Sequence, residues 1–197
     1  MYQTMVKNIF IIIFVLAAGS AKAQFTVNVQ WQNNKPENTS DTIAYDAEKK
    51  LRWNDFKGMP DATSRAAAVT ESGFGYRMSM NSYNNRMTVN ITVFCYFDKN
   101  KSWVKKGMKK DYALLHEQHH FDITYINTCL FVRKLMEAKI NRSNYNSLVE
   151  QIHDASINAL RKMQNDYDGE TSNGRIEQSQ MLWNRKIDQQ LAALTTN

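Results

Sequence analysis

The residues His116-Glu117-Gln118-His119-His120 constrain this chain more than any other feature, because they put polar groups inside a stretch with helical spacing of apolar residues. The run reads H-E-x-x-H. Four residues turn an α-helix through about 400°, so His116 and His120 project from one face, one turn apart. Two neutral imidazoles in this arrangement can bind one zinc ion, and Glu117 can act as general base toward a water molecule there. The pattern predicts a helix that carries most of a metal site and lacks a third ligand.

The helix is predicted over about Lys109–Lys139. His119 lies within its apolar stripe, so we expect it to be a core or supporting histidine, whereas His116 and His120 lie at the edge of the stripe, as a cleft requires. Two more helices are predicted near Ser143–Met163 and Arg175–Leu194. The expected inward residues of the three helices are Tyr112, Leu115, His119, Ile123, Ile126 and Leu130; Tyr145, Leu148, Val149, Ile152 and Leu160; and Ile176, Trp183, Ile187, Leu191 and Leu194.

The first half of the chain has the two-residue period of β-strands. The strongest strand is predicted over Arg86–Phe97, and Tyr76–Met80 is expected to pair with it through the turn-prone Ser82–Asn85. A weaker strand signal covers Phe25–Trp31, and Asn33–Asp41 is expected to be a loop. The core-facing set of the strongest strand is Met87, Val89, Ile91, Val93, Cys95 and Phe97. Together the two halves predict an α+β fold in which an antiparallel sheet packs on a helical second half.

The N-terminus has the pattern of a secretory signal peptide. One lysine and no acid precede an apolar run over Ile9–Ala18, which is too short for an ordinary membrane span, and Ala21-Lys22-Ala23 is a small-x-small cleavage signal. We therefore expect residues 1–23 to be removed before Gln24, leaving a single domain over residues 24–197. No cysteine follows the cut, so we expect no lipid anchor, no membrane association after removal, and a secreted or periplasmic protein.

Charge and cysteine content say less. Removing Lys7 and Lys22 lowers the formal net charge from +6 to +4, and without a binding motif we expect no nucleic-acid partner. Most of the basic residues between the main strand and the first helix are expected to be solvated: Lys99, Lys101, Lys105, Lys106, Lys109 and Lys110. Cys95 and Cys129 could form a disulfide after export or remain as two buried thiols, and either state is favoured over metal ligation.

Several positions could supply the third ligand. His153 is the one remaining histidine. The pattern from Glu150 to Asp154, E-x-x-x-D, resembles the arrangement of glutamate zincins, in which a later helix supplies a glutamate. The segment Tyr167–Gly174 is an acidic stretch that we expect to be a turn between the second and third helices, and it could fold back on the cleft.

Several stretches of residues 45–190 carry motifs: Trp53-Asn54-Asp55-Phe56-Lys57-Gly58, Ala66-Ala67-Ala68-Val69-Thr70, Ser102-Trp103-Val104-Lys105, Leu115–Ile123, Tyr167-Asp168-Gly169-Glu170-Thr171, Gln180 and Trp183. Taken together, these stretches resemble a bacterial domain family of unknown function that is described as predicted secreted zinc-dependent proteases. The resemblance implies that His116 and His120 hold zinc, that Glu117 is catalytic, and that the fold is zincin-like.

The chain departs from this family at one important position. The second motif of the family usually continues to a histidine, the natural third ligand, where this chain has Asn173. An amide oxygen is a poor zinc ligand beside imidazole or carboxylate, so we expect Asp168 or Glu170 to take over; otherwise the metal binds weakly or catalysis is lost. Asp122 also matches the family, but it lies about 200° around the helix from His120, so we expect it to make a structural hydrogen bond. We likewise expect Tyr125 to be a packed residue.

The sequence thus predicts an exported, zinc-dependent metallopeptidase-like protein that hydrolyses peptide or amide bonds in proteins or peptides of the envelope or outside the cell. Its predicted site consists of His116, His120 and Asp168 or Glu170 as ligands, with Glu117 as the base. The alternatives are a catalytically degenerate zincin-like envelope protein that acts as a binding or structural module, and a structural metal site with no open position. The sequence carries no signal for oligomeric state.

Overall fold

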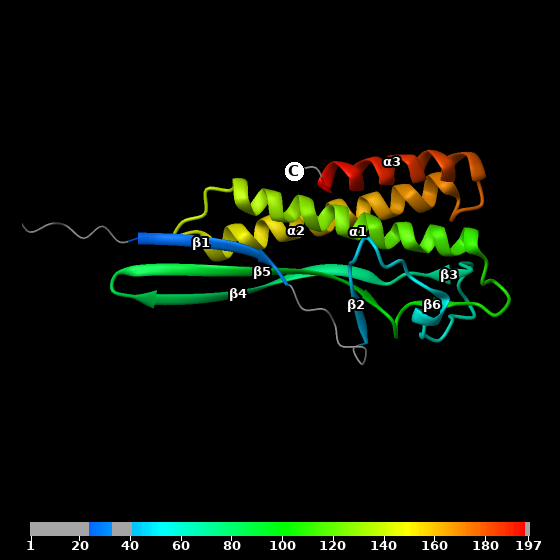
Figure 1. Cartoon of the computed structure of the whole chain (residues 1–197), viewed down its shortest axis with the longest axis horizontal. Helices are drawn as coiled ribbons and strands as arrows, with labels where there is room; N and C mark the ends of the chain where they lie inside the picture. Colours follow the sequence, from blue (N-terminus) through cyan, green and yellow to red (C-terminus); the bar gives the residue numbers. More distant parts are fainter. Residues whose placement is uncertain (1–23, 33–40, 196–197) are drawn as a thin grey trace, which may run out of the picture.

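A computed structural model describes residues 24–32 and 41–195 of the chain. The predicted signal peptide and residues 33–40 of the expected loop lie outside the described residues. The three helices lie along one face of a sheet (Figure 1), so the α+β class, with the helices in the C-terminal half, is confirmed. In chain order the elements are β1 (Gln24–Trp31), β2 (Thr42–Ala44), the 3-10 turn η1 (Trp53–Asp55), β3 (Ala68–Val69), β4 (Ser72–Tyr83), β5 (Arg86–Asp98), β6 (Trp103–Val104), α1 (Asp111–Glu137), α2 (Tyr145–Thr171) and α3 (Glu177–Thr195).

Strand β5 is the centre of the sheet. Its alternate residues from Met87 to Phe97 are buried, as its period of two predicts. β4 pairs with it in antiparallel register from Ser72↔Phe97 to Tyr83↔Arg86. The turn that joins them places Asn84 and Asn85 at φ 45° and 60°, a left-handed conformation that asparagine tolerates better than most residues.

The sheet is mixed, so the prediction of an antiparallel sheet is wrong at β1. β1 runs parallel to β5, from Gln24↔Arg86 to Trp31↔Val93, and β2 is antiparallel to the far end of the same edge, from Thr42↔Asp98. β4 takes the other edge of β5 through its hairpin. Alternation of apolar and polar residues is the same for parallel and antiparallel neighbours, so the sequence pattern could not give the direction of β1.

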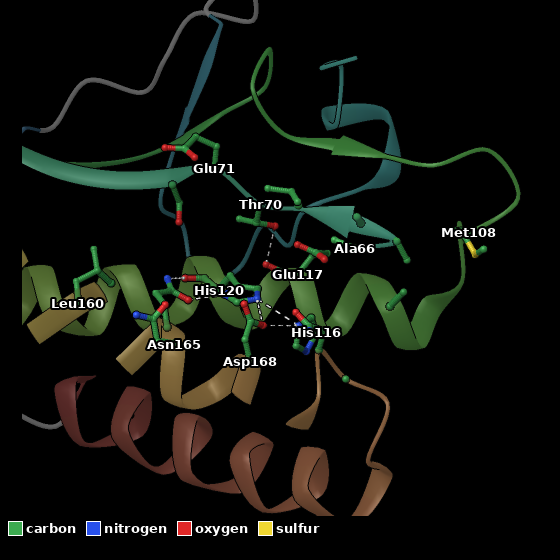
Figure 2. Close-up of a pocket in the computed structure, with 18 of the residues that line it drawn as sticks. Ala66, Thr70, Glu71, Met108, His116, Glu117, His120, Leu160, Asn165 and Asp168 are labelled. Carbon is green, nitrogen blue, oxygen red and sulfur yellow. Dashed lines mark hydrogen bonds and ion pairs between the residues drawn. The ribbon is translucent and has the colours of Figure 1, made fainter. Parts of the chain in front are cut away.

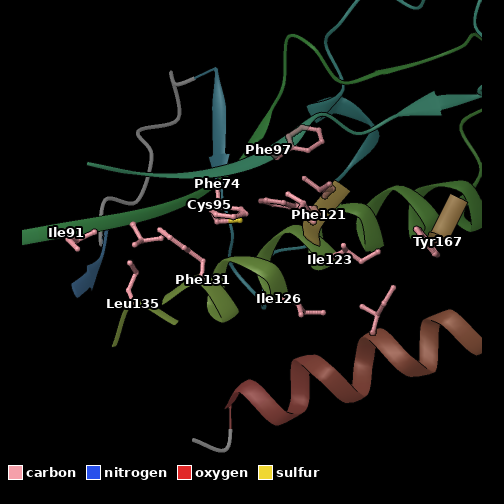
Figure 3. Packing of buried hydrophobic residues seen from close by; sticks show 14 of the residues in the cluster. Phe74, Ile91, Cys95, Phe97, Phe121, Ile123, Ile126, Phe131, Leu135 and Tyr167 are labelled. Carbon is pink, nitrogen blue, oxygen red and sulfur yellow. The ribbon is translucent and has the colours of Figure 1, made fainter. Parts of the chain in front are cut away.

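Helix α1 is buried between the sheet and the other two helices (Figure 1). Figure 3 shows its Phe121, Ile123 and Phe131 within the main hydrophobic cluster beside the β5 residue Cys95. The prediction of the inward stripe of α1 is wrong for its first and last members, which are exposed. Residues on other faces of α1 are buried as well, because the helix has neighbours on two sides. The exposed members are Tyr112, Leu115 and Leu130, at 43%, 42% and 39% of their full accessibility.

Helix α2 is longer than predicted, and this decides the site. It continues to Thr171, so the expected turn over Tyr167–Gly174 is wrong for Tyr167–Thr171, which are helical, and holds for Ser172–Gly174. It ends where Ser172, Asn173 and Gly174 all take positive φ values, of 52°, 55° and 75°. α3 starts at Glu177, so Ile176, predicted to face inward, precedes it and is exposed.

Two smaller points concern the state of the cysteines and the presence of membrane-spanning helices among the described residues. Cys95 and Cys129 are free thiols, the first buried and the second partly exposed, so of the two expected states the structure has the unbonded one. Within residues 24–32 and 41–195, no helix has the length and apolar character needed to cross a bilayer.

Candidate metal centre

Three side chains converge at the meeting point of α1 and the end of α2 (Figure 2). The Nε2 atoms of His116 and His120 lie 3.2 Å apart. The Oδ1 atom of Asp168 lies 3.2 Å from the first and 3.0 Å from the second. One carboxylate oxygen and two imidazole nitrogens therefore form a nearly equilateral triangle, and this His/His/Asp group could hold a metal ion.

The triangle has the size that a tetrahedral metal requires. Zinc lies about 2.0–2.1 Å from nitrogen and oxygen ligands, and a regular tetrahedron with such bonds has ligand–ligand edges of about 3.3 Å. The three edges here are 3.0–3.2 Å. These three residues would therefore hold a tetrahedral ion and leave its fourth position for solvent.

Hydrogen bonds at the far side of each ring orient both histidines. His116 donates from Nδ1 to the side-chain oxygen of Gln180 in α3, at 2.9 Å. His120 Nδ1 makes the same bond to Gln164 of α2. Because a neutral imidazole carries one proton, a proton on each Nδ1 leaves both Nε2 lone pairs directed at the triangle. Such outer partners fix the tautomer that a metal needs.

Tyr167 supports the same rings from below. Its ring stacks on His116 at 4.6 Å between centroids and meets His120 edge-on at 5.0 Å. The tyrosine is fully buried, and Gln180 Nε2 donates to its hydroxyl at 2.6 Å. Gln180 thus holds both the imidazole of His116 and the phenol that packs beneath it.

Asp168 remains ionised in these surroundings. Burial raises the pKa of its carboxyl, but in the metal-free protein hydrogen bonds from His116 and His120, which require a proton on Nε2, outweigh burial and hold that pKa well below its usual range. A bound metal ion would take the place of those protons. For His120, burial lowers the pKa, while the hydrogen bond to Asp168 and the charges of Glu117 and Asp168 raise it, and the net direction is upward. The pocket therefore attracts positive charge, which a divalent ion or a proton can supply.

Glu117 lies next to the triangle and lines the same cleft. Its side chain is 5% exposed, and its Oε2 atom is buried with no hydrogen-bond partner. A buried carboxylate oxygen without a donor is costly, so the site is built for a further group, such as a water molecule that a metal holds. Thr70 Oγ1 donates to the backbone oxygen of Glu117 at 3.1 Å and ties this turn of α1 to the opposite wall.

An open cleft of about 940 Å³ gives access to the triangle. One wall is the segment Ala66–Phe74, which includes β3 and the start of β4, and the other is formed by α1 and α2. Figure 2 shows Thr70 and Glu71 across the cleft from His120 and Asp168. His116 and His120 are little exposed, while Asp168 is 40% exposed, so the triangle is embedded in protein on one side and accessible on the other.

The loop after α2 closes over His116. A Cβ atom at Gly174 would lie 3.2 Å from His116 Nδ1, and Gly174 has a φ of 75°, so both close approach and backbone conformation favour glycine. Tyr112 donates its hydroxyl to the Gly174 oxygen at 2.8 Å. Asn173 lines the cleft but is not one of the three grouped ligands.

The other expected ligands lie elsewhere. Glu170, predicted as an alternative to Asp168, accepts a hydrogen bond from the Trp183 indole at 2.8 Å and joins α2 to α3. It points away because it is two residues, about 200°, beyond Asp168 on one helix. His153 is surrounded by the rings of Phe74, Tyr76 and Phe131, and Glu150 is exposed. Among the described residues, neither belongs to the group.

The supporting residues of α1 have the structural roles expected of them. Asp122 accepts hydrogen bonds from Tyr45 at 2.8 Å and from Gln118 at 2.9 Å. Its second oxygen lies 3.1 Å from Nδ1 of the buried His119. Tyr125 stacks on Tyr45, with centroids 3.9 Å apart and planes 6° from parallel. These contacts anchor α1 to the segment after β2.

Sequence reasoning missed the two glutamines. Gln164 precedes Asp168 by one turn of α2, so helical spacing alone would have placed it beside the third ligand once the helix was extended that far. Gln180 was noted as part of the resemblance but was given no role. Its place at His116 depends on how α3 packs, which its local sequence does not encode.

Comparison of the chain with protein-family models, with curated proteins and with solved structures finds no match. The resemblance to secreted zinc-dependent proteases therefore stays a prediction, and function is inferred from the geometry of the site.

Proposed function

We propose that this protein is an exported, zinc-dependent hydrolase of peptide bonds with a zincin-like active site. One observation carries the proposal: the Nε2 atoms of His116 and His120 and an oxygen of Asp168 converge within 3.2 Å of one another at the base of an open cleft. Glu117 lines the same cleft, and its charge acts on His120. A solely structural site has no need of the cleft or of a fourth, open position.

Zinc fits this donor set best. Two imidazoles and one carboxylate, with a position left for solvent, form one of the ordinary ligand sets of catalytic zinc. Calcium and magnesium prefer sites made of oxygen ligands alone. The glutamine acceptors behind both rings are the outer partners that zinc-binding histidines usually have.

The residues divide the chemistry between them. Zinc, when bound, acidifies a water molecule and polarises the substrate carbonyl. Glu117 takes the proton of the attacking water, and its buried, partnerless oxygen favours this transfer because no donor in the protein competes for it. The same carboxyl then delivers the proton to the leaving amine. Gln164 and Gln180 keep the imidazoles fixed throughout.

The wall opposite α1 supports an extended peptide as substrate. The Ala67 oxygen accepts from the backbone N–H of Lys105, directly after β6. Both backbone groups of Glu71 bond in the same direction: its N–H donates to Ser102 Oγ and its oxygen accepts from the N–H of Asp98. Backbone groups of successive strand residues point to opposite edges. Those of Ala68 and Thr70 therefore point toward the other edge, where an extended peptide can pair with them.

Export is the part of the proposal that depends on the sequence alone. The predicted signal peptide over residues 1–23 implies that the substrate is a protein or peptide of the envelope or of the medium.

The test compares the wild-type chain with Glu117→Gln and Asp168→Asn. We expect about one zinc ion per chain by elemental analysis, and cleavage of an unfolded protein that Glu117→Gln reduces by about 10²–10⁴-fold while zinc is retained. Asp168→Asn should lose zinc and activity together.

Zinc binding without Glu117-dependent cleavage would refute the enzyme and leave a binding module. Cobalt substitution then separates that result from a closed structural site, because a spectrum indifferent to added anions shows no exchangeable position. A protein that binds no metal refutes the whole proposal.

A further inference from the structure

The wall of the cleft that includes β3 and the start of β4 runs in the same direction as α1. Thr70 Oγ1 donates to the backbone oxygen of Glu117. Farther along, the hydroxyl oxygens of Ser72 and Thr124 lie 2.7 Å apart. Later residues of the wall thus lie beside later residues of α1. The cleft therefore has one end at the start of α1 and the other beyond His120 (Figure 2).

A peptide that pairs with this wall has a preferred direction. Antiparallel pairing is slightly more stable per residue than parallel pairing, and an antiparallel peptide runs against the direction of α1. Its C-terminal half would then lie at the start of α1, and its N-terminal half at the other end. The two ends of the cleft can therefore select residues on the two sides of the cleaved bond.

The end of the cleft between β4 and α2 is apolar. Phe74 of β4 and Leu160 of α2 line it and are 5% and 7% exposed. Ile157, which lies one turn before Leu160 on α2, lines it as well and is partly exposed. The charged residues here are Glu71 on the wall and Arg161 on α2, and their charges have opposite signs. This surface suits a large apolar side chain, because covering it removes apolar area from water.

The end at the start of α1 is basic. Lys110, just before α1, and Arg175, just after the loop that closes over His116, line the cleft there. Both are exposed, and among the described residues neither belongs to an ion pair. Glu177 lines the same end. The exposed charged residues next to Lys110 but outside the lining are Lys106, Lys109 and Asp111. Four positive charges thus stand against two negative ones, and this end attracts a carboxylate.

The helical rise gives the distance from each end to the metal centre. Lys110 precedes His116 by six residues, about 9 Å along α1, and Leu160 precedes Asp168 by eight residues, about 12 Å along α2. An extended peptide advances about 3.3 Å per residue. Each end therefore lies about three residues from a peptide bond held at the metal centre.

We propose that the cleft selects extended peptides with a large apolar residue about three positions before the cleaved bond and an acidic residue about three positions after it. This substrate class rests on the hydrolase proposed above for the position of the bond. Selective binding of such a peptide, in contrast, needs no cleavage.

The first test measures binding to the Glu117→Gln protein with zinc present, so that the peptides stay intact. Two fluorescein-labelled dodecapeptides share leucines in the first half and alanines in the middle, and carry glutamates in one case and lysines in the other near the C-terminal end. We expect the glutamate peptide to bind about tenfold more tightly in fluorescence anisotropy, since one exposed ion pair contributes up to about fivefold.

Lys110→Glu reverses one charge of the basic end. The Lys110 side chain makes no capping hydrogen bond, and a carboxylate suits the start of a helix, so the fold should be kept. The variant should lower the preference for the glutamate peptide by about tenfold, because it loses attraction for one peptide and gains it for the other. Lys139→Glu makes the same change in net charge at an exposed position after the other end of α1 and is the matched control. It should change the preference by less than about twofold.

The apolar end is tested with a third peptide, in which serines replace the leucines of the glutamate peptide. We expect it to bind about tenfold more weakly than the parent peptide. Ile157→Gln should reduce this difference, because it removes part of the apolar surface that the leucines cover. Ile157 is only partly buried, so the variant should remain folded. A difference between the two peptides that Ile157→Gln leaves unchanged would contradict the apolar half of the proposal.

The second test digests a mixture of unfolded proteins with the wild-type chain and identifies the cleaved bonds by mass spectrometry. We expect acidic residues to be enriched two to four positions after the cleaved bond and large apolar residues two to four positions before it, on the spacing of about 3.3 Å per residue. Enrichment of acidic residues before the bond would overturn the proposal, because the peptide would then run in the other direction.

The two tests separate this proposal from the hydrolase itself. Equal affinities for the glutamate and lysine peptides, no binding of either at millimolar concentration, or equal effects of Lys110→Glu and Lys139→Glu would overturn the proposed selectivity, even in an active enzyme. Selective binding that Lys110→Glu reverses, in a protein that cleaves nothing, would support the peptide class and refute the hydrolase alone.

Discussion

Replacing Gln180 by methionine tests whether the hydrogen bond from His116 to this residue of α3 increases the zinc affinity of the metal centre. The glutamine is 1% exposed, and its oxygen accepts from His116 Nδ1 at 2.9 Å. Methionine has nearly the same volume but cannot accept this bond. His116 then either keeps a buried N–H without a partner, at a cost of about 1–3 kcal/mol, or moves its proton to Nε2 and loses the lone pair that faces the triangle. Either route weakens zinc binding, by about 10–100-fold on the scale of known outer partners.

The assay is a competition titration against a chromophoric zinc chelator at pH 7.5, together with thermal unfolding of the metal-free protein. Gln190→Met is the matched control, since Gln190 lies on the same helix and its side-chain oxygen already has no hydrogen-bond partner. We expect the control to bind zinc like the wild type. A Gln180→Met protein whose zinc affinity stays within twofold of wild type would refute the reasoning that the glutamine fixes the tautomer of His116.

Three further predictions concern the third ligand, the loop and the thiols. Asp168→Asn removes the charged ligand and should weaken zinc binding by more than about 100-fold in the same titration; unchanged affinity would show that another residue is the ligand. Gly174→Ala should destabilise the metal-free protein by about 1–3 kcal/mol in urea unfolding, because a Cβ would face a ring at 3.2 Å and a φ of 75°. Gly107→Ala, with a φ of 82° but open space, should cost less, and equal losses would contradict the contact with the ring. Burial raises the pKa of Cys95 to about 12 and also raises that of the half-buried Cys129, so a disulfide reagent at pH 8 should label Cys129 slowly and Cys95 only on unfolding; prompt labelling of both would contradict it.

The helix pattern shows how far local periodicity reaches. Spacing predicted α1 to within about two residues at each end and gave His116 and His120 a common face. It failed for Leu115 and Leu130, which are exposed, and for Phe121 and Phe131, which are buried. An apolar stripe along a single face is the pattern of a helix on the surface of a domain. α1 is covered by the sheet on one side and by α2 and α3 on the other, so it buries residues on more than one face.

The third ligand shows what local sequence patterns could not predict. The candidates Asp168 and Glu170 stand in the same short motif, and composition cannot choose between them. The choice follows from the continuation of α2 to Thr171. Residues two positions apart on a helix point in nearly opposite directions, about 200° apart, so only one of Asp168 and Glu170 can face α1. The expected turn would have left both free to approach the cleft.

The sequence by itself determined what is local: the strand alternation of β5, the three helices, and two imidazoles one turn apart beside a glutamate. The tertiary structure alone decided what joins distant segments: the parallel pairing of β1, Asp168 as the third member of the triangle, and the glutamines that aim the rings. The physical reason is range. Backbone geometry fixes the spacing of residues within one element, while the approach of α2 and α3 to α1 results from burial of the whole apolar core, which no single segment encodes.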